Sequence, residues 1–168
     1  MQRESGLPRF SVIVRAYNSE RYIGKALDSV LAQSYAGLVD IIVPYDRGTA
    51  DGTARVLGAY GDVKVPNRSV TAVEHEHTTP FRALQIGLER ALEGPSDYMG
   101  FLESDNAMDG AYLERAIEAA SPTATNSIRY LPRGGAAMWR WGACASFPIS
   151  FRLNMSRARI ILQLPPSG

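Results

Sequence analysis

The sequence is poor in cysteine, in long apolar runs and in acidic residues toward its end, and the first two shortages exclude whole classes of protein. A single cysteine, Cys144, excludes an internal disulfide and a cysteine metal cluster. No apolar run approaches the roughly 20 residues that span a bilayer, and residues 1–10 have no apolar stretch of the kind that directs secretion. With a length of 168 residues, these features predict a globular, cytoplasmic protein with a buried core.

Two common nucleotide-binding motifs are also missing. The sequence contains neither a Gly-x-Gly-x-x-Gly fingerprint nor a Gly-x-x-x-x-Gly-Lys-Ser/Thr phosphate loop. These motifs bring backbone N–H groups to the phosphates of dinucleotides and of nucleoside triphosphates. Their absence argues against a dinucleotide oxidoreductase and against a P-loop NTPase.

Charge is distributed unevenly along the chain. All 17 acidic residues lie at or before Glu118, and the segment after it carries six arginines: Arg129, Arg133, Arg140, Arg152, Arg157 and Arg159. A basic segment of this kind can meet phosphates, nucleic acid or an anionic membrane surface, or it can dock on the acidic first part of the chain. We expect a peripheral membrane contact, if any, to be made by this segment.

Strand and helix patterns alternate over the first 120 residues. Short apolar runs have the pattern of buried strands at 11–14, 39–43, 70–73 and 98–102. Apolar residues at helical spacing follow each run, and Asn18 or Ser19 is available to cap the first helix. Strands at 127–131 and 160–164 are weaker predictions from the same reasoning. Alternation of this kind predicts an α/β fold with a mostly parallel, Rossmann-like sheet flanked by helices.

Polar turns follow the first, second and fourth strands, and they contain Ala16-Tyr17-Asn18, Asp46 and Glu103-Ser104-Asp105. The carboxyl ends of parallel strands share one edge of the sheet, where ligands bind in such folds. We therefore expect the three turns to meet. An aromatic ring and a carboxylate there can hold a nucleobase. The alternatives are a half-buried surface tyrosine and a turn-forming aspartate.

The pair formed by Glu103 and Asp105 predicts a cation site. Alternate residues at the end of a strand point the same way, and two neighbouring carboxylates repel unless a cation or protons neutralise them. Mg²⁺ and Mn²⁺ commonly take one or two carboxylates together with substrate phosphates. The alternative is a polar loop that caps the following helix.

Two further residue types have a structural explanation. His75 and His77 alternate after the third strand, but no third metal ligand is identifiable near them, so we interpret them as a solvated strand end. Cys144 is interpreted as a small buried apolar residue and not as a nucleophile.

Three segments, taken in order, resemble a known family. SVIVRAYNSERYIGKALDSVLAQSY, DIIVPYDRGTADGT and FRALQIGLERALEG with YMGFLESDN are similar to the N-terminal part of a family 2 glycosyltransferase. The match covers roughly residues 9–118. The resemblance implies the GT-A fold, a nucleoside diphosphate sugar as donor and a divalent cation, Mn²⁺ or Mg²⁺. It also implies a hydroxyl acceptor, which is a glycan, a lipid or a small molecule, and no nucleic-acid partner.

The resemblance also implies roles for individual residues. Tyr17 and Asp46 would contact the base, with Ala16 and Asn18 in the same turn. Asp105 would bind the metal and the diphosphate, Glu103 would lie near the ribose, the donor sugar or the metal, and Ser104 lies between them. Arg82 is near the position of an arginine that helps with the donor phosphates, although the alignment places Leu84 at that position.

The sequence departs from the family pattern in several places. Arg15-Ala16 replaces Pro-Thr, Arg47 replaces the second Asp of the turn, and Glu103 replaces the first Asp of the Asp-x-Asp metal motif. The family's general base lies well beyond that motif, and no Asp or Glu follows Glu118 here. The catalytic base is therefore unknown from the sequence.

The sequence as a whole predicts a metal-assisted, inverting glycosyltransferase. Residues 1–120 are expected to form the nucleotide-sugar-binding α/β domain. Residues 121–168 are expected to form an atypical basic segment, a partial acceptor region of the same domain, with a truncated or altered C-terminus. The chain is expected to be cytoplasmic and in contact with a membrane at most peripherally. Two alternatives stay open: a nucleotide-binding module or fragment without turnover, and a nucleotidyltransferase, for which the Gly-rich phosphate loop is absent.

Overall fold

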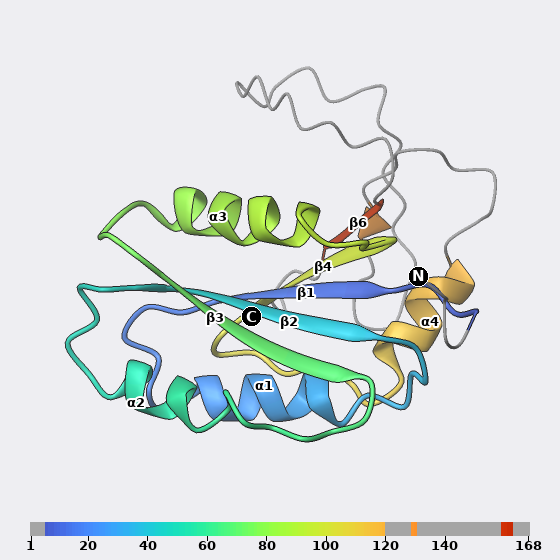
Figure 1. Cartoon of the computed structure of the whole chain (residues 1–168), viewed down its shortest axis with the longest axis horizontal. Coiled ribbons are helices and arrows are strands. Elements are labelled where there is room, and N and C mark those ends of the chain that lie inside the picture. Colours follow the sequence, from blue (N-terminus) through green and yellow to red (C-terminus); the bar gives the residue numbers. More distant parts are fainter. Residues whose placement is uncertain (1–5, 120–128, 131–158, 163–168) are drawn as a thin grey trace, which may run out of the picture.

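The computed structural model describes residues 6–119, 129–130 and 159–162. Figure 1 shows one twisted sheet with helices on both of its faces. The strands are β1 (Phe10–Arg15), β2 (Val39–Asp46), β3 (Arg68–His75), β4 (Tyr98–Glu103), β5 (Arg129–Tyr130) and β6 (Arg159–Leu162). The helices are α1 (Ile23–Leu31), α2 (Thr53–Gly58), α3 (Pro80–Leu92) and α4 (Tyr112–Ala119).

The sheet has the order β3-β2-β1-β4-β6-β5, and all of its described strand pairs are parallel. The parallel, helix-covered sheet that the alternation predicts is therefore confirmed. β2 is longer than the apolar run 39–43, because Tyr45 and Asp46 still pair with Glu74 and His75 of β3. Asp46 is thus the last residue of a strand and the first residue of the turn that follows it.

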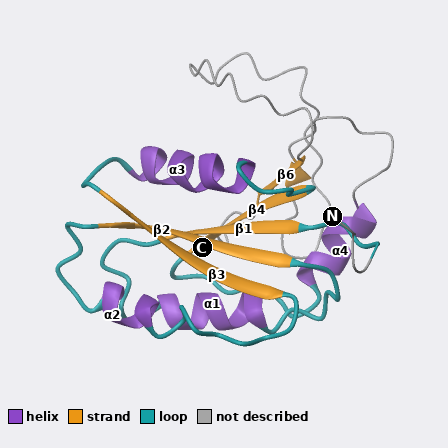
Figure 2. Cartoon of the chain, in the orientation of Figure 1, coloured by secondary structure: helices purple, strands orange, loops and turns teal. Residues whose placement is uncertain are grey.

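Helices cover both faces of the sheet (Figure 2), and two apolar layers hold them there. On one face, the buried residues of α1 pack on β1 and β2 together with Leu57 of α2 and Leu113 of α4. On the other face, Leu88 and Ala91 of α3 pack against Ile13, Ile42 and Met99. The amphipathic spacing in α1 explains its orientation, because Ile23, Ala26, Leu27 and Val30 are all buried on one side.

Gly87 sets how closely α3 approaches the sheet. A Cβ atom at this position would lie 2.5 Å from Cγ2 of Ile13 and 3.2 Å from Cγ of Pro44. Such distances are shorter than van der Waals contact, so only a residue without a side chain fits between the helix and the sheet. The helix backbone therefore lies directly against β1 and β2.

The order in which the chain adds strands to the sheet reverses between β1 and β4. From β1 the chain moves outward through α1, β2 and α2 to β3, and α3 then carries it back across β2 and β1 to β4. α1 and α3 lie on opposite faces of the sheet, as Figure 1 shows, because the chain moves outward through α1 and returns through α3. In open α/β sheets ligands bind at the carboxyl ends of the strands at such a reversal of strand order.

The last two strands overlap the segments predicted as strands, 127–131 and 160–164, and β6 pairs with β4. The rest of residues 121–168, including Cys144 and most of the basic segment, lies outside the described residues. The division of the chain near residue 120 stays a prediction. Within the described part of the chain, no helix is both long enough and apolar enough to cross a membrane.

Candidate functional site

The end of β1 and the turn after it are tied to the turn after β2. Ala16 bridges to Tyr45 of β2, and its N–H donates to the Pro44 carbonyl at 3.0 Å. Asn18 has a left-handed backbone, with φ of 47°, and its Oδ1 accepts from the Ala50 N–H at 2.9 Å. The predicted role of Asn18 as a helix cap is therefore wrong, since its side chain closes the contact between two turns. Ser19 does not cap α1 through its side chain either.

Asp46 is a buried carboxylate with three donors around it. The residue is 3% exposed. Its Oδ1 accepts from the Gly48 N–H at 2.7 Å, and its Oδ2 accepts from the Thr78 N–H at 3.3 Å and contacts Nδ1 of His77 at 2.8 Å. Burial raises the pKa of Asp46, but the hydrogen bonds from Gly48, Thr78 and His77 outweigh it, so that the pKa lies below its ordinary value. A carboxylate accepts about four hydrogen bonds, and these three neighbours occupy three of those positions at Asp46.

His77 belongs to this site, although the sequence indicated only a solvated strand end. Besides its bond to Asp46, its ring lies 5.6 Å from the ring of Tyr17, centroid to centroid, at an angle of 49°. Tyr17 itself is 50% exposed, so a planar ligand has access to it. The signal that predicts this contact is the register of β2 and β3, which sets Asp46 opposite His75, two residues before His77. That register is not readable from one sequence.

The turn after β4 presents one engaged and one accessible carboxylate. Oε2 of Glu103 accepts from a guanidinium nitrogen of Arg15 at 2.6 Å. The hydroxyl groups of Ser104 and Ser19 are 2.8 Å apart, which links this turn to the one after β1. Asp105 is exposed, and its Oδ1 accepts from the side-chain amide of Asn106 at 3.2 Å. Asp105 is thus the carboxylate of this turn that is open to an incoming ligand.

The carboxylate oxygens of Glu103 and Asp105 are ligands of the kind that a hard divalent cation takes when it binds together with a substrate. Among the described residues, no group of three or more His, Cys, Asp or Glu side chains is placed to hold a metal. The His75 and His77 pair therefore forms no such site within that part. Asp105 alone, or Asp105 with Glu103, could supply the one or two carboxylates that Mg²⁺ or Mn²⁺ uses when substrate phosphates complete its shell. If Glu103 also bound the cation, its carboxylate would have to contact both the cation and the Arg15 guanidinium.

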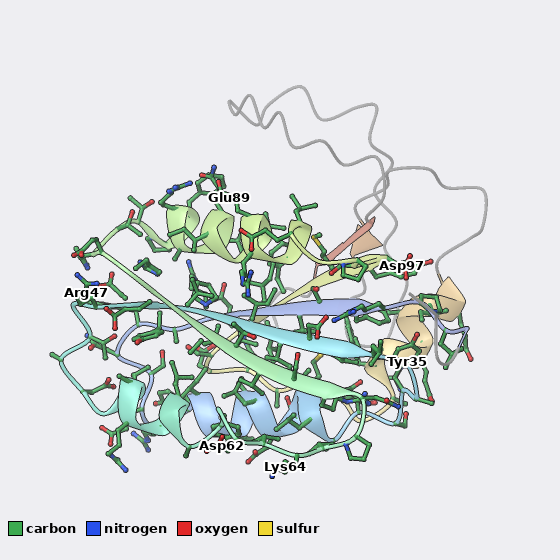
Figure 3. All side chains as sticks on the ribbon, viewed as in Figure 1. Tyr35, Arg47, Asp62, Lys64, Glu89 and Asp97 are labelled. Carbon is green, nitrogen blue, oxygen red and sulfur yellow. The ribbon has the colours of Figure 1, made fainter. Side chains whose placement is uncertain are left out.

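Arg82 does not lie with these residues. Its guanidinium pairs with Glu89 at 3.1 Å, and Gln85 donates to the same carboxylate at 2.9 Å. Figure 3 shows Glu89 on the side of α3 that faces away from the sheet. Leu84, the residue that aligns with the family's arginine, packs into the apolar layer under α3. The structure therefore brings together Ala16, Tyr17, Asn18, Asp46, Glu103, Ser104 and Asp105, and places Arg82 on the outer surface of α3.

Arg47 stands in the turn after β2, where the family pattern has a second Asp. Its guanidinium pairs with acidic side chains at the carboxyl end of β3. Its Nε donates to Glu74 at 2.6 Å, and its terminal nitrogen pairs with Glu76. The side chain is 61% exposed, so these surface pairs stabilise the fold little. Their effect is that the Arg47 guanidinium is already paired with Glu74 and Glu76.

The carboxylates that shape the turn after β2 make stability depend on pH. Burial raises the pKa of Asp51, but hydrogen bonds from Thr53 and from the Glu20 N–H outweigh it, so that the pKa lies below its ordinary value. Hydrogen bonds from the Gly52 N–H and from Arg55 lower the pKa of Glu20. Since these pKa values and that of Asp46 are lower in the folded state, the unfolded chain binds more protons in acid. Their contribution to the free energy of unfolding is present above about pH 5 and is lost as the pH falls through the folded pKa values.

We therefore expect the free energy of unfolding, measured by urea titration at several pH values from 7 to 3, to decrease as the pH falls below about 5. Asp51→Asn is expected to lower stability at pH 7 and to flatten this dependence. A wild-type curve that is flat between pH 5 and 3 would contradict the assignment of these hydrogen bonds.

The sheet order and the helices on both faces match an α/β fold of the GT-A type. The chain belongs to glycosyltransferase family 2, because the model of that family, Glycosyl transferase family 2, matches residues 11–157. The resemblance read from the sequence is confirmed.

Relatives share the domain at low identity. The chain is 29% identical to the minor teichoic acid biosynthesis protein GgaA of Bacillus subtilis over 124 residues, 73% of this chain and 27% of GgaA. It is 27% identical to the glycosyltransferase AglE of Haloferax volcanii over 146 residues, 82% of this chain and 45% of AglE. The crystal structure of residues 1–349 of TarS from Staphylococcus aureus matches with a TM-score of 0.55 at 21% identity, over 79% of this chain and 38% of that one. The chain thus spans less than half the length of these relatives.

Proposed function

We propose that this chain binds a nucleoside diphosphate sugar at the carboxyl edge of its sheet and provides the donor half of an inverting, metal-assisted sugar transfer to a hydroxyl acceptor. One observation carries the proposal. Asp46 ends β2, while Tyr17 and Asp105 follow the adjacent strands β1 and β4, and hydrogen bonds between the turns hold them at one edge. The position coincides with the reversal of strand order, where this class of sheet binds ligands.

Each part of the donor has a counterpart in this arrangement. The Tyr17 ring offers a stacking surface, and Asp46 offers an ionised acceptor for a ring N–H. Ala16, Asn18 and Ser104 belong to the turns that frame the space between the base and the diphosphate. Asp105, with Glu103 beside it, would hold Mn²⁺ or Mg²⁺, and the ion would act as a Lewis acid that neutralises the departing diphosphate.

Calorimetry with UDP, GDP and dTDP, each with and without Mn²⁺, tests the proposal. UDP is the first probe because TarS, which has the same fold, has been crystallised with UDP and with UDP-GlcNAc. We expect one of the three nucleotides to bind, and to bind more tightly with Mn²⁺. Absence of binding by all three, or affinity that does not change with the metal, would overturn the proposal.

A second candidate is a nucleotide-binding module without turnover. It is favoured by the lack of any Asp or Glu after Glu118, where the family pattern has its general base. Asp109, in the loop after the metal turn, is paired with Arg115 at the surface. Assays of donor hydrolysis and of sugar transfer separate the two candidates, because both predict nucleotide binding but only the first predicts product.

Tyr17 provides a direct test of the base site. Tyr17→Ala removes the exposed ring and is expected to weaken binding of the nucleotide about 10-fold, since stacking of a base on an aromatic ring is worth about 1–3 kcal/mol. Tyr17→Phe keeps the ring and is the matched control, with an expected change below about 3-fold. Equal affinity of the alanine variant and the wild type, measured by calorimetry, would place the base elsewhere.

A further inference from the structure

Arg15 lies at the point where the diphosphate of the proposed donor would be bound. It is the last residue of β1, and the register of β1 and β4 sets it opposite Glu103. Ile13 and Phe101, two residues earlier on each strand, belong to the apolar layer under α3. By alternation Arg15 and Glu103 lie on the same face of the sheet, at its carboxyl edge, next to the turn that carries Asp105.

The guanidinium of Arg15 is held in place but not saturated. Its side chain is 30% exposed, and among the described residues its hydrogen-bonding partner is Glu103, at 2.6 Å. A guanidinium has five N–H donors in a planar fork that matches carboxylate and phosphate oxygens. One edge of the fork is fixed by Glu103, and the remaining donors are available to a ligand.

The other arginine considered for the phosphates is engaged elsewhere. Arg82 forms its ion pair with Glu89 on the outer side of α3, and the aligned position on the inner side is the apolar Leu84. Arg47, at the edge near the base site, is paired with Glu74 and Glu76. Of these three arginines, Arg15 is the one that lies beside the metal-motif carboxylates.

We propose that Arg15 is a phosphate-binding residue of the donor site and that Glu103 is its positioning partner. The inference rests on the proposed function. The fixed positive charge would share neutralisation of the diphosphate with the divalent cation. Glu103 would then serve to orient the guanidinium, and Asp105 would be the principal carboxylate for the metal.

The test compares uridine, UMP and UDP, which carry the same base and different numbers of phosphates. Arg15→Met is expected to weaken UDP binding roughly 10-fold or more, as for loss of a charge-assisted hydrogen bond, and to leave uridine binding unchanged. Arg90→Met, which removes the same charge from the far end of α3, is the control and should change neither. Arg82→Met is the rival variant, and we expect it to bind UDP like the wild type.

The outcomes separate this inference from the proposed function. If the wild type binds none of UDP, GDP and dTDP, both are wrong. If it binds UDP and Arg15→Met binds UDP equally well, or if Arg82→Met shows the loss instead, only the role of Arg15 is wrong. Equal losses for uridine and UDP would show that Arg15 acts through the fold. Should Arg15→Met fail to fold, Arg15→Gln removes the charge and keeps a polar side chain, and unchanged UDP affinity in that variant would overturn the inference.

Discussion

Replacing Asp105 by asparagine is expected to abolish the enhancement of nucleotide binding by Mn²⁺ and to reduce affinity for the nucleoside diphosphate by about 100-fold in its presence. A metal ion next to a negatively charged diphosphate stabilises it by several kcal/mol, and each 1.36 kcal/mol of binding free energy corresponds to a tenfold change in affinity. Asp105 is exposed in the turn after β4, and asparagine keeps its shape. Calorimetry with and without Mn²⁺ measures the loss directly.

Asp62→Asn is the matched control for this variant. Asp62 is exposed on the α1 and α2 side of the molecule (Figure 3), so the substitution removes one negative charge and leaves the turns after β1, β2 and β4 unchanged. We expect its affinity and its response to Mn²⁺ to equal those of the wild type. If Asp105→Asn still binds more tightly with Mn²⁺, the cation is held by other residues and the proposed metal position is wrong.

Replacing Gly87 by valine is expected to lower the free energy of unfolding by about 3 kcal/mol, the upper part of the range for overpacked cores. Its first side-chain atom would meet Ile13 and Pro44 at distances well inside van der Waals contact, so α3 has to move away from β1 and β2. Movement of α3 also displaces the apolar layer that it shares with Ile42 and Met99. Urea unfolding at pH 7 measures the change.

Gly58→Val makes the same substitution at the end of α2, where an added Cβ would have no atom within 4 Å. We expect its stability to lie within about 0.5 kcal/mol of the wild type, as for most surface substitutions. A similar loss in both variants would mean that valine destabilises through helix propensity and not through the close approach of α3 to the sheet.

The parts of the molecule that repeat a local pattern were predictable. The strands and helices up to residue 119 follow from apolar runs and helical spacing, and parallel pairing follows from their alternation. Because parallel strands align their carboxyl ends, the meeting of the Tyr17, Asp46 and Asp105 turns was also predictable. Strand ends were less accurate, since the polar pair Tyr45–Asp46 stays in β2 through its ladder with β3.

The contacts within the site were not predictable from one sequence. The pairing of Arg15 with Glu103 depends on the register between two strands 88 residues apart. The contact of His77 with Asp46 and Tyr17 depends on the path of the chain after β3. Periodicity fixes which face a side chain takes, but register and loop path are set by packing across the whole sheet.

The central position of β1 has a consequence for synthesis of the protein on the ribosome. Of the described strands, β1 is made first, and its neighbour β4 follows 88 residues later. At about 5–20 residues per second, one edge of this apolar strand waits roughly 4 to 18 s for its partner. During that interval α1, β2 and α2 are made and can cover part of the nascent strand. The late synthesis of β4 gives β1 its second neighbour and, in the same event, brings Glu103 and Asp105 to the turns after β1 and β2.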